Sequence, residues 1–452
     1  MPVRVRAVFG VLLLLGLFST RPAQAQVTPP QLIQLNPFLT QQARFTNVQY
    51  NIYPSGLDLA VPLIETGNIM AGPLAVHPHF GIAQSYTDNV FRTDTTFGGR
   101  RPDWYQTLAP GLQLQLPFLS RYKLVADYRS NLERYNRDSS QDVDDYTFAT
   151  NLIAEYPGGL SVKLLEELRN GHDYRGAATA TGVAEPNKFF NTSYGGEVQL
   201  ASQTFVRARF KSIRWEFIGP NAGPRDGTSF GDINTRNRLE HYAALAVGGR
   251  VAPKSYVFLE GWTSRQLYEI NKDLDSTVYV MSLGSTWEAT GKTTGNFAMG
   301  WQGRHMDRPS AGTRGSGTFS SLYFNGYVTW KPQEQTQVNW GIYRRTNETV
   351  LGGTRYFIST GTTLDVGHSF TEKWRGTLQL VYDHDTYSDP ITAEGKTAQR
   401  KDNYVTLGAG LWYQIQPWLG TRATYTYGER LSVFNSVQYV SSVIMLSAQA
   451  QF

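Results

Sequence analysis

Apolar and polar residues alternate along most of the chain from residue 76 to the C-terminus. In residues 404–415, for example, Leu407 and Leu411 fall on one face, whereas Thr406 and Gln414 fall on the other. A spacing of two is typical of β-strands, because successive side chains point to opposite faces. No helical period interrupts the pattern. The chain is therefore predicted to be all-β, with one strand face suited to lipid and the other to water.

Turn signals divide this region into about eighteen strands. An even number of antiparallel strands returns both chain ends to the same side of a membrane barrel. The strands are expected at residues 76–87, 104–116, 121–135, 143–156, 160–172, 189–201, 204–217, 237–251, 254–268, 275–289, 292–305, 319–331, 335–347, 355–369, 373–387, 402–416, 418–432 and 437–452.

The connections between strands alternate in length, which predicts the orientation. Short turns, expected on the periplasmic side, fall at residues 157–159, 202–203, 252–254, 291–292, 332–334 and 417. Long polar loops, expected outside the cell, fall at residues 88–103, 174–187, 219–235, 307–318 and 388–401. Tryptophans near strand ends fit the two headgroup levels of a bilayer: Trp104, Trp215, Trp287, Trp330, Trp374 and Trp418. These features favour a transmembrane antiparallel β-barrel over a soluble β-sandwich.

The first 25 residues have the organisation of a secretory signal peptide. Arg4 and Arg6 precede an apolar run at residues 8–18, and Ala23 and Ala25 supply the small residues of a cleavage site. The apolar run has eleven residues, whereas a membrane-spanning helix needs about 20. Cleavage after Ala25 predicts export to the periplasm and residence in the bacterial outer membrane.

Composition narrows the class further. Only 17% of residues are charged while 13% are aromatic, Gly is frequent at 43, and mean hydropathy is −0.36. So low a mean hydropathy excludes a helical membrane bundle. It fits a barrel, in which apolar outward residues alternate with polar inward ones and their hydropathies average out. The absence of Cys excludes disulfides and thiol nucleophiles. Removing the three arginines of the signal peptide from 42 basic residues leaves 39 against 37 acidic ones, so a nucleic-acid partner is not expected.

Residues 26–75 do not follow the strand pattern. They are rich in Pro, Gln and Asn, with scattered apolar residues. We expect an irregular periplasmic or plug segment, and a flexible tether is an equally good interpretation. The predicted organisation is therefore a signal peptide at residues 1–25, this segment at residues 26–75 and a barrel at residues 76–452.

The last strand carries a pattern of its own. Ile444, Leu446, Ala448, Ala450 and the terminal Phe452 alternate with Met445, Ser447, Gln449 and Gln451. This pattern resembles the C-terminal signature by which outer-membrane proteins are delivered to the barrel-insertion machinery. The strand is predicted to carry the barrel-assembly signal, and the alternative is an ordinary closing strand whose final Phe is there by chance.

Thirteen basic and eleven acidic residues are expected to point into the lumen, so no filter of one sign is predicted along its whole length. Arg207, Arg209 and Lys211 occupy consecutive inward positions of one strand. They could line a track for an anionic polymer, or they could pair with Glu197 and Glu240 of flanking strands. The complete predicted substrate path is Arg207, Arg209, Lys211, Arg250, Arg304, Arg345, Arg375, Arg422 and Arg430 with the aromatic residues Trp262, Tyr323 and Tyr343.

Enzymatic motifs are weak. His77 and His79 share a strand face, but two ligands at a strand start do not define a metal site. Residues 291–293 read Gly-Lys-Thr, yet the upstream Gly of a phosphate-binding loop is missing and the segment is a hairpin turn. No Ser-His-Asp set is evident from spacing. We therefore expect no catalytic residues, no cofactor and no metal.

The segment at residues 79–93 contains Tyr86, Asp88, Asn89, Val90 and Phe91 in the order Tyr-x-Asp-Asn-Val-Phe. It resembles the opening strand of the outer-membrane β-barrel porin 2 family. The resemblance of organisation covers about residues 76–452, but this motif is its one specific stretch.

That resemblance implies a role in exporting an exopolysaccharide or capsular polysaccharide, with periplasmic export components as partners and outer-membrane lipid as surroundings. Fold alone does not define function, so two alternatives stay open. One is a general or substrate-selective porin for small solutes. The other is a structural or adhesive surface barrel that acts through its long loops.

Overall fold

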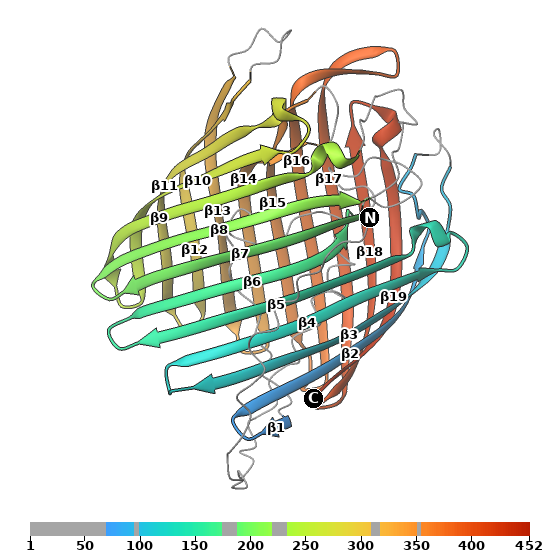
Figure 1. Ribbon diagram of the computed structural model, residues 1–452. Coiled ribbons are helices and arrows are strands. Elements are labelled where there is room, and N and C mark those ends of the chain that lie inside the picture. Colours follow the sequence, from blue (N-terminus) through green and yellow to red (C-terminus); the bar gives the residue numbers. More distant parts are fainter. Residues whose placement is uncertain (1–68, 95–98, 174–187, 219–232, 309–316, 350–353) are drawn as a thin grey trace, which may run out of the picture.

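The protein is a closed antiparallel β-barrel of eighteen strands, β2 to β19, in a computed structural model that describes residues 69–94, 99–173, 188–218, 233–308, 317–349 and 354–452 (Figure 1). Each strand pairs with the next one in sequence, and β19 returns to pair with β2. That closing ladder runs from the Val443–Thr87 pair to the Gln451–His79 pair. The predicted fold class and strand count are confirmed.

The strands lie close to the predicted ranges. Four short 3-10 turns join some of them at the extracellular end: η2 (Ser139–Gln141), η3 (Ile233–Arg236), η4 (Lys272–Leu274) and η5 (Asn435–Val437). Among the described residues, no helix is long and apolar enough to cross a bilayer. The barrel strands are β2 (Leu74–Thr87), β3 (Asp103–Phe118), β4 (Tyr122–Tyr135), β5 (Val143–Tyr156), β6 (Leu160–His172), β7 (Lys188–Ala201), β8 (Thr204–Ile218), β9 (Arg238–Ala252), β10 (Ser255–Tyr268), β11 (Ser276–Thr290), β12 (Thr293–Met306), β13 (Thr318–Gln333), β14 (Thr336–Glu348), β15 (Tyr356–Ser369), β16 (Trp374–Ala393), β17 (Lys396–Gln416), β18 (Leu419–Ser432) and β19 (Tyr439–Gln451).

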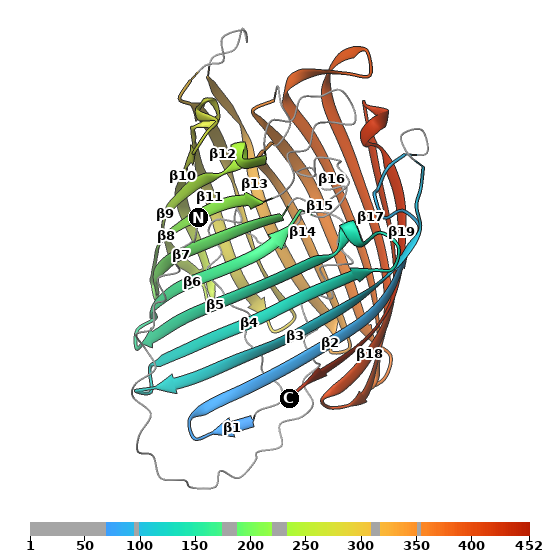
Figure 2. The ribbon, with the colours of Figure 1, turned by 45° about the vertical axis from the view of Figure 1, so that its right-hand side comes forward.

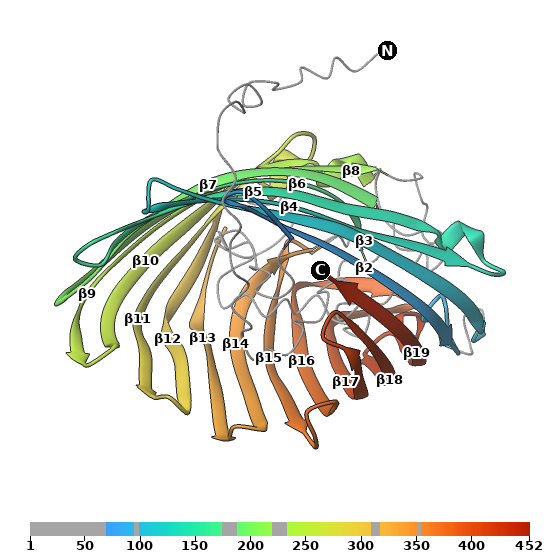
Figure 3. The same ribbon diagram turned by 90° about the horizontal axis from the view of Figure 1, so that it is seen from below.

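The ring of strands is elongated rather than round. Seen along the barrel axis (Figure 3), β2–β8 form one broad wall and β10–β19 form the facing wall. Figure 2 shows the inner face of the second wall across the lumen from β2–β6. Side chains from both walls therefore point into one shared interior.

The two faces of the strands have the predicted chemistry. Outward side chains are apolar and exposed, such as Leu378 and Leu446, each with 62% exposure. Inward side chains are polar and buried, such as Arg304 at 1% and Asp402 at 0%. The tryptophan prediction is wrong for Trp215, whose ring lies inside the barrel and stacks on that of Phe217, with centroids 6.0 Å apart.

The predicted loop at residues 388–401 is wrong. β16 and β17 continue through it to a two-residue turn at Glu394 and Gly395, which have φ values of 53° and 73°. Pro390 and the polar composition of this segment had predicted a loop. In the structure, Pro390 lies just after a register shift in the ladder, where its missing N–H is tolerated. The hairpin packs Ile391 and Ala393 against Phe434 beside η5.

A short strand, β1 (Ile69–Ala71), precedes the barrel and pairs with the start of β2. The last part of the segment predicted to be irregular is therefore a small hairpin, and the first barrel strand begins at Leu74. The predicted signal peptide and most of the predicted plug lie outside the described residues. The predicted loop at 174–187 and most of those at 219–235 and 307–318 do so too.

Candidate functional site

The three consecutive cations on β8 lie on the inner wall, as predicted, but two of them share a carboxylate. One terminal nitrogen of Arg207 and one of Arg209 each donate to Oε2 of Glu260 at 2.8 Å. Glu260 is on β10, two strands away. Ala246 of β9 stands between Arg207 and Glu260 in the ladder, and its small side chain lets the arginine cross.

The two carboxylates considered as partners of these cations also bind other basic residues. Glu197 pairs with Lys163 at 3.2 Å, and Glu240 pairs with Arg238 at 2.6 Å. Lys211 is also buried on the next inward position. Two of the three cations of the possible polymer track therefore share one carboxylate, and the role of the track stays a prediction.

Arg304 of β12 holds a second buried network. Its guanidinium donates to both oxygens of Glu348, at 2.7 and 2.8 Å, and to Gln266 and Ser276 at 2.9 and 2.8 Å. The hydroxyl of Tyr268 donates to the same carboxylate at 2.6 Å. Such a fork of charge-assisted bonds ties four strands together on the lumen side.

Asp402 of β17 forms a third network. It accepts from Arg400 at 2.8 Å, from Arg430 at 2.6 Å and from Ser432 at 2.6 Å. The guanidinium groups also lie over aromatic rings. That of Arg400 is 4.7 Å from the ring centroid of Tyr387, and that of Arg430 is 5.1 Å from the ring centroid of Tyr404. The single carboxylate therefore offsets the charge of one of the two arginines.

The sequence analysis missed three charged members of these networks, for different reasons. Arg400 fell in the predicted loop at 388–401. Asp402 was detectable, because it has the same parity on β17 as the inward Trp412. Glu348 is the last residue of β14, where the pleat ends and alternation no longer fixes the side-chain direction.

The other residues of the predicted path are spread around the barrel. Trp262 and Tyr323 meet edge to face, with ring centroids 6.2 Å apart, in an apolar cluster of β8–β13. Tyr343 lies on β14, with Arg345 over its ring at 5.2 Å. The three remaining arginines lie apart from these groups: Arg250 is exposed at the periplasmic end of β9, Arg375 is partly buried on β16, and Arg422 donates to Thr377 at 3.2 Å.

The Tyr-x-Asp-Asn-Val-Phe motif extends the seam between β2 and β19. Past the last ladder pair, the Asp88 carboxylate accepts from the Ser442 amide at 2.7 Å. The side-chain nitrogen of Asn89 donates to the carbonyl oxygens of Val440 and Thr93, both at 2.9 Å. These bonds continue β-type pairing with side chains after the backbone of β2 turns away. A barrel closes only at its seam, so the motif has a structural role there.

Phe91 and Tyr86 complete the motif by ring contacts. The guanidinium of Arg101 lies 5.3 Å from the ring centroid of Phe91. Tyr86 packs against Trp104 on the neighbouring strand, with centroids 5.0 Å apart. Val90 is buried.

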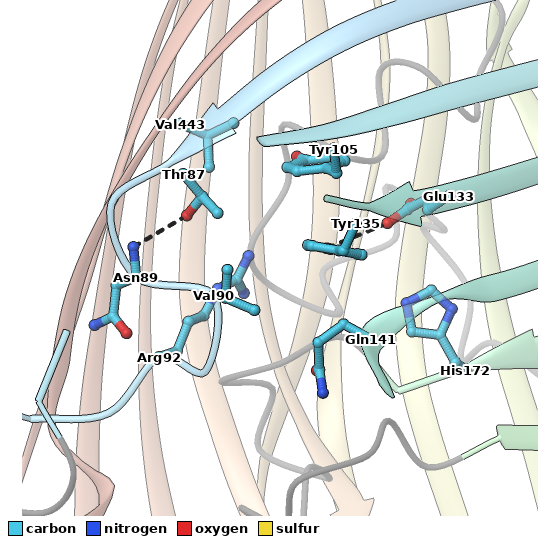
Figure 4. A pocket seen from close by; sticks show the side chains of 10 residues that line it. All are labelled: Thr87, Asn89, Val90, Arg92, Tyr105, Glu133, Tyr135, Gln141, His172 and Val443. Carbon is cyan, nitrogen blue, oxygen red and sulfur yellow. Dashed lines mark hydrogen bonds between the residues drawn. The ribbon is translucent and has the colours of Figure 1, made fainter. Parts of the chain in front are cut away.

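A cavity of about 50 Å³ lies below this turn (Figure 4). Stacked rings of Tyr105 and Tyr135 form part of it, with centroids 4.8 Å apart and an interplanar angle of 22°. His172 is held by an ion-pair contact of 2.9 Å to Asp145. The lining residues are Thr87, Asn89, Val90, Arg92, Tyr105, Glu133, Tyr135, Gln141, His172 and Val443.

Metal binding finds no support in the described part of the chain. No group of three or more His, Cys, Asp or Glu side chains there could hold an ion. His77 is buried and His79 lies over Gly111 of β3.

Comparison with known proteins identifies the family. The model of the family described as "Putative beta-barrel porin 2" matches residues 62–452. The chain belongs to this family. The predicted resemblance is confirmed, and the match begins before the first barrel strand. No curated protein matches the chain.

Several solved outer-membrane barrels resemble this β-barrel porin. The outer membrane protein OpdK from Pseudomonas aeruginosa has a TM-score of 0.45 and 11% identity, and 83% of this chain and 99% of that chain are covered. The siderophore receptor PirA from Acinetobacter baumannii has a TM-score of 0.43 and 9% identity, with 83% and 80% covered. OccAB3 from the same organism has a TM-score of 0.42 and 9% identity, with 83% and 99% covered.

The family and the closed barrel with a lipid-facing apolar surface indicate residence in the bacterial outer membrane. The barrel there is surrounded by membrane lipid and offers a porin-type interior.

Proposed function

We propose that this porin is a passive outer-membrane conduit for an exported exopolysaccharide or capsular polysaccharide. The observation that carries the proposal is the charge-paired inner wall. Arg207 and Arg209 share Glu260, Arg304 binds Glu348, and Asp402 binds two arginines. The three carboxylates offset part of the charge of the five arginines, so the wall offers hydrogen-bonding groups with a weaker field of one sign than the arginines alone would give.

Such a wall suits a chain of hydroxyl groups. A sugar polymer exchanges hydrogen bonds with water for hydrogen bonds with side chains, and it needs no counter-charge. Inward aromatic rings such as Trp262 and Tyr323 add surfaces on which sugar rings can stack. Polymer synthesis and periplasmic export components would supply the driving force.

A cysteine-blocking experiment in the native host tests this proposal. The chain has no cysteine, so single cysteines can be labelled selectively. Asn296→Cys places a thiol on an inward position of β12, and Phe297→Cys places one on the neighbouring outward position. We expect a bulky thiol reagent to reduce surface polysaccharide only in the Asn296→Cys strain.

Two outcomes would oppose polymer export. Unchanged surface polysaccharide together with slower uptake of small solutes would establish the small-solute porin instead. If neither polymer export nor solute uptake responds to labelling, the pore is dispensable and the structural or adhesive alternative applies. Polymer that accumulates in the periplasm after labelling would support the proposal.

A further inference from the structure

The cavity under the first extracellular turn is built from a fold-back of the chain into the lumen. After β2, the amide of Arg92 donates to the carbonyl of Asn89 at 3.2 Å, which closes a tight turn. Arg92 has a φ of 47°, a left-handed conformation that is costly for a residue with a side chain. The bonds of Asn89 to Val440 and Thr93 hold this turn in place.

This strained turn directs the Arg92 side chain toward the tyrosines of the cavity (Figure 4). Its guanidinium lies 5.9 Å from the ring centroid of Tyr439 on β19. Backbone strain that the surroundings maintain is a feature of functional sites. Here the strained turn places the Arg92 cation in the same cavity lining as Tyr105, Tyr135 and Glu133.

The charges around the cavity are mixed. Arg92 and His172 are basic, whereas Glu133 and Asp145 are acidic. Glu133 accepts from Asn131 at 2.8 Å and from the Tyr135 hydroxyl at 3.5 Å. An anion would meet the two carboxylates and a cation would meet Arg92. A neutral group that both donates and accepts hydrogen bonds fits this lining best.

The size of the cavity limits the ligand. A volume of about 50 Å³ is a few times the roughly 10–15 Å³ needed to hold one water molecule. It admits one hydroxyl or hydroxymethyl group, but not a whole sugar ring. A ring would lie at the cavity mouth, beside the tyrosine pair, while one of its substituents entered.

The geometry points to a neutral-sugar subsite in this cavity, with Arg92, Glu133 and Tyr135 as its binding residues. This inference rests on the proposed polysaccharide conduit and adds where the polymer is held and which sugar chemistry is accepted. The subsite would retain neutral sugars at the extracellular end of the lumen, next to the seam that closes the barrel.

Sugar binding to the full mature protein, refolded in detergent, tests the subsite directly. Methyl α-glucopyranoside, glucuronate and glucosamine serve as neutral, acidic and basic probes, titrated by ligand-observed NMR. We expect the neutral probe to bind most tightly. We expect Tyr135→Leu and Glu133→Gln to raise its Kd at least fivefold, because each removes a binding group from the cavity.

Tyr327→Leu is the matched control, because Tyr327 points inward from β13 on the other wall. Its Kd should equal that of the unmodified protein, and heat-modifiable gel mobility should show that every variant is folded. Equal losses in Tyr135→Leu and Tyr327→Leu would overturn the assignment to this cavity. Tighter binding of glucuronate or glucosamine would overturn the neutral-sugar assignment.

The binding measurement involves no transport, so its failure differs from failure of the proposed function. Absence of sugar binding with intact polymer export removes the subsite alone. Binding that weakens in Tyr135→Leu, in a host whose export does not respond to lumen blocking, keeps the subsite and removes the export role. Neutral oligosaccharides added to one side of a bilayer then identify the side from which the sugar enters the lumen. An exported chain would block the current when it is added on the periplasmic side.

Discussion

At the residue scale, shared carboxylates set the electrostatics of the lumen. Glu260 pairs with two buried guanidinium groups at once, both at 2.8 Å. Buried charges are tolerated only when they are paired, so a change at this one carboxylate affects both arginines. The same logic applies to Asp402 with its two arginines.

Replacing Glu260 with Gln tests this pairing. Loss of the shared carboxylate should lower the free energy of unfolding by about 3 kcal/mol. It should also shift the channel toward anion selectivity, because two cations lose their compensating charge. Equilibrium unfolding and reversal potentials in a salt gradient measure the two effects.

Glu288→Gln is the control for that experiment. Glu288 pairs with Lys254 at 2.6 Å at the exposed periplasmic rim. Exposed ion pairs contribute no more than about 1 kcal/mol, so little change is expected. Equal effects of the two substitutions would contradict the account of the β8 cations.

Residue pairing was the part of the site that the sequence could not provide. Alternation placed Arg207, Arg209 and Lys211 inward, and the structure agrees. The partner of the arginines depends on how far a long side chain reaches across the wall. The small Ala246 lets it pass β9 to Glu260, and no local pattern on β8 contains that information.

At the element scale, the seam between β2 and β19 depends on side chains beyond its ladder. Asn89 is buried, and its amide supports carbonyls from two segments. Asn89→Ala should therefore lower the free energy of unfolding by about 1–3 kcal/mol, because two acceptors lose their donor. Asn170→Ala, which removes an exposed bond to the Asp144 carbonyl, is the matched control. Equal destabilisation in both would show that the motif does not act at the seam.

The β16–β17 hairpin makes a pH-dependent contact with η5. Glu394 accepts from the Ser436 amide at 2.6 Å. Burial acts to raise the pKa of Glu394, but the hydrogen bonds from Ser436 and Asn435 and the charge of Lys396 outweigh it, so its pKa lies below the ordinary value of 4.5. The contact therefore stabilises the fold fully above pH 4.5 and weakens as pH falls below that value.

Hydrogen exchange across residues 435–437 measures this effect. Protection, corrected for intrinsic rates, should fall below pH 4.5 in the unmodified protein. In Glu394→Gln it should be low at every pH and show no such step. A step that persists in Glu394→Gln would assign the pH dependence to another group.

Strand positions could be predicted from sequence because a barrel wall separates lipid from water at every residue. That constraint forces a period of two, which located all eighteen strands. The hairpin at residues 388–401 extends past the other strands, where a lipid face is no longer required. Its polar residues therefore predicted a loop, whereas the structure has two paired strands joined by a two-residue hairpin turn at Glu394 and Gly395.

At the scale of the whole molecule, the C-terminal residue joins the periplasmic end of the seam. The Phe452 amide donates to the Pro78 carbonyl at 3.0 Å, and its ring stacks on Trp418 with centroids 5.2 Å apart. Phe452→Ala should reduce the fraction of heat-modifiable, membrane-inserted protein in cells several-fold, because it removes this anchor and the predicted assembly signal. Normal insertion of the variant would contradict that role.

The barrel as a whole presents a polar interior in which buried arginines are paired with buried carboxylates. The family match and the eighteen-stranded ring were both predictable, since they rest on patterns that run through the whole chain. The cavity beside the seam was not, because its lining comes from β2, β3, β4, β6, β19 and two turns that only the closed ring brings together.

Single-channel recording of the refolded mature protein in planar bilayers tests the proposed conduit most directly. Neutral and acidic polysaccharides are added to one side at a time, and residues 26–68 are removed in a second preparation to test the predicted plug. The account predicts discrete current blocks by the neutral polymer, with longer events than for the acidic one. A steady small-solute conductance that no polymer interrupts, with or without residues 26–68, would contradict it.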